Sequence, residues 1–291
     1  MIEGIIIRGY SGFYYVQTND SIYECSLRGR YRLKKQDFLP GDRVMILPRQ
    51  GEGKGVIEEL LPRKVELLRP AIANVNQAIL VIPLNNKQPD LMLLDRLLIM
   101  TTNAGIRPII CFNKVDLADE NVAADLKQLY QKIGYQTILT SAKKEIGIQE
   151  LKNELYGNIS VFAGPSGVGK SSLLNAVEPG LELQTGEVSR KSQRGRHTTR
   201  YTSLLALKEG GFVADSPGFS CLHLPEMKRE ELASYFPEFS LQQQCKFTTC
   251  LHHTEPECAV KQALEEGKID PRRYEHYLDF LVEVIAKERS Y

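Results

Sequence analysis

Short apolar runs separated by turn residues fill residues 1–65. The runs are rich in β-branched and aromatic side chains, which suit pleated strands better than helices. Glycine, Asn-Asp and Pro-Gly-Asp interrupt them at turn-like intervals. The clearest runs lie at 5–7, 13–16, 23–31 and 43–47. About five strands in so short a stretch predict a small all-β barrel.

Over residues 66–222 the chain alternates between apolar strands and amphipathic helices, after a link at 62–70. The strands are short continuous apolar runs, and the helices carry apolar residues at three- and four-residue spacing. We expect strands at 78–82, 108–112, 136–140 and 159–163, and helices at 91–102, 122–133, 148–155 and 171–177. This alternation predicts a doubly wound, mostly parallel α/β sheet.

The pattern changes twice beyond residue 180. The segment 180–200 is polar and irregular, and the two apolar runs after it flank Glu209-Gly210-Gly211, which predicts a β-hairpin over 202–214. After Leu224 the chain is charged and mostly helical, with Cys and His gathered between 245 and 258. We therefore expect a third, C-terminal domain over 223–291.

Composition limits the possible classes of protein. The 291 residues suggest two domains, or three with a small module, and an apolar fraction of 42% is enough for ordinary cores. A net charge of +1 provides no global field for nucleic acid, so any RNA-binding surface must be local. The chain has no leader-like N-terminus and no run of about 18 apolar residues. We expect no signal peptide, no membrane span and a cytoplasmic protein.

A GxxxxGKS string lies where an expected strand gives way to a helix. Glycines in such a loop let backbone N–H groups curl around phosphate oxygens, and the following helix adds its positive dipole end. Lys170 would reach the β- and γ-phosphates, and Ser171 would place its hydroxyl on Mg²⁺. The predicted phosphate-binding residues are Gly164, Pro165, Ser166, Gly167, Val168, Gly169, Lys170, Ser171 and Ser172.

A guanine-reading motif precedes this loop in the chain. Asn113-Lys114-Val115-Asp116 follows an expected strand, at the end where α/β sheets bind ligands. The Asp116 carboxylate can accept hydrogen bonds from the guanine N1–H and exocyclic amine, a donor pair that adenine lacks. Ser141-Ala142-Lys143 follows the next strand and resembles the SAK element of GTPases, in which a backbone N–H contacts the guanine oxygen. Both motifs are predicted to bind GTP.

Asp215-Ser216-Pro217-Gly218 ends the expected hairpin and fits the DxxG element of GTPases. Asp215 would hold Mg²⁺ through water, and the Gly218 amide would sense the γ-phosphate. The four elements, each after its own strand, resemble those of translation-factor-class P-loop GTPases. In most GTPases the phosphate loop comes before NKxD, so the inverted order predicts a circularly permuted domain. DxxG then leads directly into the C-terminal domain, and we hypothesise that γ-phosphate contacts at Gly218 reposition that domain.

The segment between the phosphate-loop helix and the hairpin must contain switch I. Thr198 and Thr199 can each complete the Mg²⁺ shell, and we favour Thr199. Phe219 follows DxxG and cannot orient water as the Gln of Ras-like GTPases does. His197 is the best substitute in the sequence, although it can equally contact RNA or solvent. The predicted catalytic residues are His197, Lys170 and Thr199.

The same segment is dense in basic residues, with no acid among them. Such a patch is a candidate RNA contact, and a solvated loop is the alternative. The basic residues are Arg190, Lys191, Arg194, Arg196 and Arg200.

The C-terminal tail carries a C-x4-C-x-H-x5-C cluster formed by Cys245, Cys250, His252 and Cys258. Three thiolates and one imidazole are a closed, tetrahedral structural zinc set. By spacing alone His253 is an alternative imidazole, and buried free thiols are the alternative to a metal. The tail is too short for a core of its own, which a metal would remedy. The other cysteines are interpreted as ordinary buried residues: Cys25, Cys111 and Cys221.

A β-barrel, a permuted GTPase and a Cys3His tail in this order resemble the ribosome small subunit-dependent GTPase A family (RsgA, also called YjeQ or YloQ). The match covers the whole chain through NKVD, SAK, GPSGVGKSS, RGRHTT, DSPG and the Cys/His cluster. It implies an OB-fold barrel, one structural zinc, and a GTPase that the small ribosomal subunit stimulates during its late maturation. It also implies His252 as zinc ligand and a link between His197 and hydrolysis. Ser216, where the family often has Thr, is a mild departure.

The residues of the barrel agree with RNA binding. Cations alternate with aromatic residues, so that bases can stack while the cations meet phosphates. For each aromatic residue taken singly, a place in the small core is the better interpretation. The residues concerned are Arg28, Arg30, Arg32, Lys34 and Lys35, with Tyr23, Tyr31 and Phe38.

Three functions are compatible with these features. The leading one is a monomeric GTPase that binds the small ribosomal subunit and its rRNA and acts in subunit maturation. The second is a GTP-gated RNA-binding module in which hydrolysis is incidental. The third is a GTPase that serves another RNA, such as transfer RNA during its modification.

Overall fold

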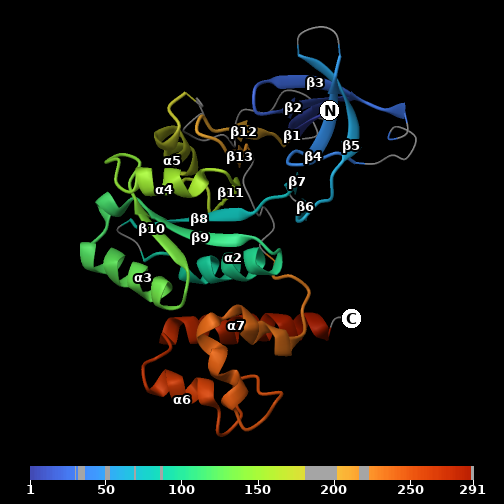
Figure 1. Cartoon of the computed structure of the whole chain (residues 1–291). Coiled ribbons are helices and arrows are strands. Elements are labelled where there is room, and N and C mark those ends of the chain that lie inside the picture. The colour runs from blue at the N-terminus through green and yellow to red at the C-terminus, as the bar shows by residue number, and fades with distance from the viewer. Residues whose placement is uncertain are drawn as a thin grey trace, which may run out of the picture.

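The computed structural model describes residues 1–29, 31, 37–49, 53–68, 70–85, 88–180, 202–215 and 223–289. Figure 1 shows three bodies in chain order: a β-barrel, a central α/β domain and a helical C-terminal unit. The barrel and the C-terminal unit lie on opposite sides of the central domain, which therefore touches both.

The N-terminal strands close into a barrel in the order β1-β2-β3-β5-β4. All neighbours are antiparallel except β3 and β5, which is an OB-type Greek-key arrangement. The inward side chains form the barrel core, and this core includes Phe38, with Tyr23 and Tyr31 packed against it. The strands are β1 (Ile2–Tyr10), β2 (Phe13–Gln17), β3 (Ile22–Leu27), β4 (Arg43–Pro48) and β5 (Lys54–Leu60). The predicted barrel is confirmed.

The expected strand at 23–31 is wrong at its C-terminal end. β3 stops at Leu27, and the backbone at Gly29 and Tyr31 is helical. Pairing with β5 ends at Leu27, two residues before Gly29, and glycine weakens a strand interior. The predicted link at 62–70 also contains structure, because β6 (Glu66–Leu68) pairs with β7 (Ala71–Ala73) as a short antiparallel ribbon.

The central sheet has the order β10-β9-β8-β11-β13-β12, and only β12 runs antiparallel to its neighbour. Its apolar runs are buried on both faces, as the sequence predicts for a parallel sheet. The strands are β8 (Gln77–Pro83), β9 (Arg107–Asn113), β10 (Gln136–Thr140), β11 (Ile159–Ala163), β12 (Leu204–Ala206) and β13 (Phe212–Ala214).

Helices cover both faces of this sheet. One layer packs into the cluster around Leu80 and Phe112, and the other into the cluster around Ile79 and Val81. The helices of the first layer are α2 (Leu91–Asn103) and α3 (Glu120–Lys132), and those of the second are α4 (Ile148–Leu155) and α5 (Lys170–Val177). The strand that leads into the phosphate loop, β11, comes fourth in the sheet along the chain. The permuted, doubly wound domain is confirmed.

The C-terminal unit is helical and, contrary to the expectation from its length, has a hydrophobic core. Within it Phe236, Phe239 and Tyr277 meet at ring-centroid distances of 4.9–5.3 Å. Its elements are the 3₁₀ helices η2 (Arg229–Tyr235) and η3 (Pro237–Gln244), followed by α6 (Ala259–Glu265) and α7 (Pro271–Glu288). Ile99 of α2 belongs to the same core, so this unit packs on the outer side of the first helix layer. Within the described part of the chain, none of the helices has the length and apolar character that a membrane crossing requires.

Candidate functional site

The phosphate loop connects the buried strand β11 to the N-terminus of α5. Gly164 and Gly169 both have positive φ angles, 138° and 102°. A Cβ on Gly164 would collide with the backbone oxygen of Val81, and one on Gly169 would collide with the Asn113 side chain. Only glycine fits at these two positions, which explains why the loop can lie so close to its neighbouring strands.

Lys170 folds back over this loop. Its Nζ donates hydrogen bonds to the carbonyl oxygens of Gly164 at 2.8 Å and Pro165 at 2.7 Å. Burial lowers the pKa of the ammonium because fewer waters stabilise its charge. A phosphate anion in the loop would stabilise the charged ammonium and offset the cost of its burial. The lysine therefore lies where it can bind a negatively charged ligand.

The NKxD motif is tied directly to the phosphate loop. Asn113, at the end of β9, donates from Nδ2 to the Val168 oxygen at 2.8 Å. Lys114 donates from Nζ to the Gly167 oxygen at 2.8 Å, and its own backbone is left-handed with φ 64°. Two motifs that are more than fifty residues apart in the chain therefore meet at one edge of the sheet.

Asp116 is held by the SAK element. The Ser141 hydroxyl donates to Asp116 Oδ1 at 2.6 Å, and Ser141 Oγ accepts from the Lys144 N–H at 3.1 Å. Ser141 is buried and pairs through its backbone with Ile146, which fixes the turn after β10. The hydrogen bond from Ser141 fixes one carboxylate oxygen of Asp116.

Several predicted residues lie at the edges of the described chain or outside it. Ser171 occupies the first turn of α5, and Asp215 is exposed directly after β13, with its N–H bonded to the Ser203 oxygen at 2.9 Å. His197, Thr198, Thr199, Gly218 and Phe219 lie outside the described residues. So do Cys221, the cations of the 190–200 segment, and Arg30, Arg32, Lys34 and Lys35 of the barrel.

The four predicted metal ligands converge in the C-terminal unit. The candidate ligand atoms of Cys245, Cys250, His252 and Cys258 all lie within 4.8 Å of one another. The Cys245 and Cys258 sulfurs are 3.9 Å apart, and His252 Nδ1 lies 3.6 and 3.4 Å from them. Tetrahedral zinc with bonds of about 2.3 Å to sulfur separates two thiolates by about 3.8 Å, which fits this spacing.

The chemistry of the donors also fits a metal. His252 is buried, and its burial lowers the pKa of the imidazole, which favours the neutral form that binds metals. Burial raises the pKa of the Cys250 thiol to about 12, a penalty that a bound dication would offset. His253, the alternative by spacing, is exposed. Of the two histidines, His252 is the one that lies with the three sulfurs.

Two tyrosines of α7 support this cluster and were not found from the sequence. Tyr274 donates its hydroxyl to the His252 backbone oxygen at 2.6 Å, and Tyr277 donates to the Leu251 oxygen at 2.8 Å. The two tyrosines are three residues apart in an amphipathic helix. This spacing predicts only that they share the face that packs against the core. They hold the backbone of the ligand loop, where His252 has a positive φ of 57°.

The phosphate loop, NKxD and SAK meet on one sheet, and the strand before the phosphate loop is the fourth of that sheet along the chain. This arrangement defines a circularly permuted P-loop GTPase. The model of the RsgA GTPase family matches residues 60–225, and that of the RsgA N-terminal domain matches residues 3–57. The chain belongs to the RsgA GTPase family and is therefore a GTP hydrolase. The predicted resemblance is confirmed.

Relatives of similar length cover the whole chain. The small ribosomal subunit biogenesis GTPase RsgA of Moorella thermoacetica is 55% identical over 100% of both chains. The protein of the same name from Carboxydothermus hydrogenoformans is 49% identical over 99% of this chain and 100% of its own. Two crystal structures are 38% identical to the chain. YjeQ from Thermotoga maritima has a TM-score of 0.83 over 98% of each chain, and the circularly permuted GTPase YloQ has 0.84 over 99% of this chain and 96% of its own.

Proposed function

We propose that this GTPase binds the small ribosomal subunit, acts late in its biogenesis and hydrolyses GTP faster when bound to it. The connected nucleotide site is the observation that carries the proposal, because Asn113 and Lys114 join the guanine-reading motif to the phosphate loop. Relatives that match over their whole length are named for small-subunit biogenesis, which supports the choice of partner.

We assign the residues of the site by these contacts together with their sequence motifs. Asp116 reads guanine, supported by Ser141, and the SAK backbone contacts the guanine oxygen. The phosphate-loop N–H groups and Lys170 bind the phosphates. Bound Mg²⁺ would neutralise charge on the β- and γ-phosphates. Its ligands would be Ser171, Thr199 and, through water, Asp215.

The metal of the Cys3His cluster is proposed to be zinc with a structural role. All four positions of a tetrahedral site are filled by protein ligands, which leaves no open position for chemistry. We further propose that the protein works as a cytoplasmic monomer and that the barrel contacts rRNA. Arg8 lies over the Tyr15 ring at 4.2 Å, so at least one aromatic-cation pair of the barrel surface is preorganised.

One assay separates this function from its two alternatives. Purified protein is given GTP alone, with small ribosomal subunits, or with free RNA including transfer RNA, and phosphate release is measured. The proposal predicts that subunits alone raise kcat by orders of magnitude. Nucleotide-dependent binding without stimulation would instead favour a GTP-gated RNA-binding module. Stimulation by transfer RNA would favour the third function.

His197 is proposed to position the attacking water. The change His197→Ala is expected to slow subunit-stimulated hydrolysis by roughly 10²–10³-fold, the loss typical of one positioned group, and to leave GTP affinity near normal. Single-turnover hydrolysis on subunits, together with nucleotide titration, measures both quantities. Unchanged stimulated turnover would remove His197 from the mechanism.

A further inference from the structure

One whole face of α2 is occupied by the C-terminal unit. Met92 and Ile99 pack with the core of that unit. Between and beyond them, Arg96 pairs with Glu283 at 2.7 Å, and Asn103 accepts a hydrogen bond from the Tyr235 hydroxyl at 2.8 Å. With Asp95, these residues recur every three or four positions, which is the spacing of one helical face. The opposite face, with Leu94, Leu97 and Leu98, lies in the core of the central domain.

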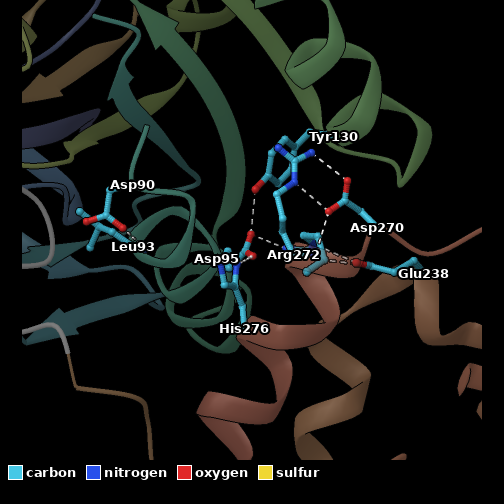
Figure 2. Close-up of polar contacts among 9 residues, drawn as sticks. Asp90, Leu93, Asp95, Tyr130, Glu238, Asp270, Arg272 and His276 are labelled. Carbon is cyan, nitrogen blue, oxygen red and sulfur yellow. Dashed lines mark hydrogen bonds and ion pairs between the residues drawn. The ribbon is translucent and has the colours of Figure 1, made fainter. Parts of the chain in front are cut away.

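At the centre of this face a group of buried polar side chains joins four elements. We name it the Asp95 cluster: Asp95 of α2, Tyr130 of α3, Glu238 of η3, and Arg273 and His276 of α7. Figure 2 shows Asp95 between Tyr130 and His276, which donate to its two carboxylate oxygens at 3.0 and 2.6 Å. Arg273 forms an ion pair with Asp95.

Arg273 connects the two domains through charge. Its side chain is 3% exposed, and besides Asp95 it binds Glu238 by two hydrogen bonds of 2.7 and 3.0 Å. The guanidinium also lies over the rings of Phe236 at 4.7 Å and Tyr130 at 5.6 Å. Buried ions in such a network permit few alternative arrangements, because any displacement leaves a charge without a partner in a medium of low polarity.

Apolar packing does not continue from this cluster toward the start of α3. A cavity of about 580 Å³ lies there, lined by residues of all three helices, among them Leu91, Val122, Leu126, Arg272 and His276. The polar cluster, rather than a continuous apolar interface, therefore fixes α7 against α3 on this side.

The chain reaches the C-terminal unit directly from the DxxG element. Asp215 is held by its N–H bond to Ser203, the residue before β12, and Leu224 is already buried in the C-terminal unit. The Leu224 oxygen accepts a hydrogen bond from Lys287 Nζ of α7 at 2.9 Å. The helix that carries Arg273 and His276 thus also holds the first residues of the unit.

We propose that Asp95 and Arg273 are positioning residues for subunit-stimulated hydrolysis. They hold the C-terminal unit on α2 as one rigid body, and so provide a fixed anchor for the chain that leaves the DxxG element. This inference rests on the proposed function. It differs from the hypothesis that γ-phosphate contacts reposition the C-terminal unit, since here that unit keeps its place on α2 in every nucleotide state.

The first test measures the distance between the two bodies in the free protein. Fluorescent labels introduced at the exposed positions 128 of α3 and 282 of α7 report this distance. The expected result is one narrow distribution that is the same with GDP and with a non-hydrolysable GTP analogue. Arg273→Gln should broaden it, whereas Arg272→Gln should not, because Arg272 is exposed and pairs with Asp270 of its own helix cap. A nucleotide-dependent shift in the unchanged protein would overturn the proposal.

The second test measures turnover. Arg273→Gln should lower the subunit-stimulated kcat on the order of tenfold, within the usual range of coupling between sites, and leave basal turnover and GDP affinity unchanged. Arg272→Gln should change none of these. Bound zinc is measured to verify that the unit is folded. If Arg273→Gln loses zinc, Asp95→Asn, which lies outside the metal-binding unit, takes its place with the same expectations.

Equal stimulated turnover in Arg273→Gln and Arg272→Gln would refute the positioning role. If the unchanged protein is not stimulated by subunits at all, the proposed function fails. The distance measurement on the free protein still decides whether the two bodies are rigidly joined, so the two failures are distinguishable.

Discussion

Asp116 is the single residue on which nucleotide choice should depend. In Asp116→Asn the side-chain amide can donate to the carbonyl that xanthine carries at position 2, but it repels the guanine amine there. We expect GTP affinity to fall by about 3 kcal/mol, or roughly 100-fold, and affinity for xanthosine triphosphate to rise. Calorimetric titration with both nucleotides measures the change.

Asp119→Asn is the matched control for this variant. Asp119 is close in sequence but caps α3, accepting from the Asn121 N–H at 2.8 Å, and asparagine caps a helix nearly as well. Its nucleotide affinities should stay unchanged. Equal losses in both variants would mean that the effect reports the stability of this region and not base recognition.

At the residue scale the sequence predicted sites that depend on local patterns. The glycines of the phosphate loop, NKxD and the Cys3His cluster each have their chemistry within a few residues, so a short pattern is sufficient. Asp95 and Arg273 are 178 residues apart, and each alone looks like an ordinary charged residue of an amphipathic helix. Only the docking of two domains brings them together, and no local pattern contains that information.

At the scale of elements, the metal should hold the C-terminal unit together. His252→Gln removes one ligand, so zinc binding should weaken by more than the 10–100-fold that is typical for loss of an outer-shell partner. Cys258 is itself buried in the core of the unit, so the unit should lose helical signal when the metal leaves. Zinc content and circular dichroism with and without a chelator measure both effects.

His253→Gln supplies the control for the metal site. This neighbour is exposed and its N–H bonds to Glu255 at 2.9 Å, away from the sulfurs. The variant should bind zinc and unfold like the unchanged protein. Loss of zinc from His253→Gln, with retention in His252→Gln, would reverse the ligand assignment.

Long periodic elements were predictable from their period, and the short strands β12 and β13 from the turn residues between them, whereas the ribbon of β6 and β7 was not predicted. The four helices of the central domain and its buried strands have enough residues for a period to appear. The ribbon of β6 and β7 has three residues in each strand, too few for any alternation. Its second strand lies against the barrel turn, where a Cβ on Gly41 would collide with the Ala73 oxygen and the Ala73 N–H bonds to the Pro40 oxygen. Such contacts are tertiary, and no pattern in the local sequence predicts them.

At the scale of the whole molecule, a buried carboxylate lies at each border of the central domain. Asp95 and Arg273 fix the C-terminal unit, and a second ion pair with a buried carboxylate joins the barrel to the link that follows it. Asp42, fully buried before β4, accepts from Arg63 Nε at 2.7 Å and a second guanidinium nitrogen at 2.8 Å. This pairing raises the pKa of the Arg63 guanidinium, which stays charged at every accessible pH. Both borders therefore contain a carboxylate that would be costly to bury without its cation.

The barrel attachment gives a testable expectation for the whole chain. Arg63→Gln leaves the Asp42 carboxylate buried without its cation, so the protein should lose on the order of 3 kcal/mol of stability toward urea. Arg43→Gln is the control, because its partner Glu3 is 46% exposed and such surface pairs contribute about 1 kcal/mol or less.

The Asn74 side chain and the Ala73 N–H still bond to the barrel turn in both variants. The barrel should therefore stay folded but loosely placed in Arg63→Gln, with weaker subunit binding and unchanged GTP affinity. Equal stability of the two variants would show that Asp42 does not need Arg63.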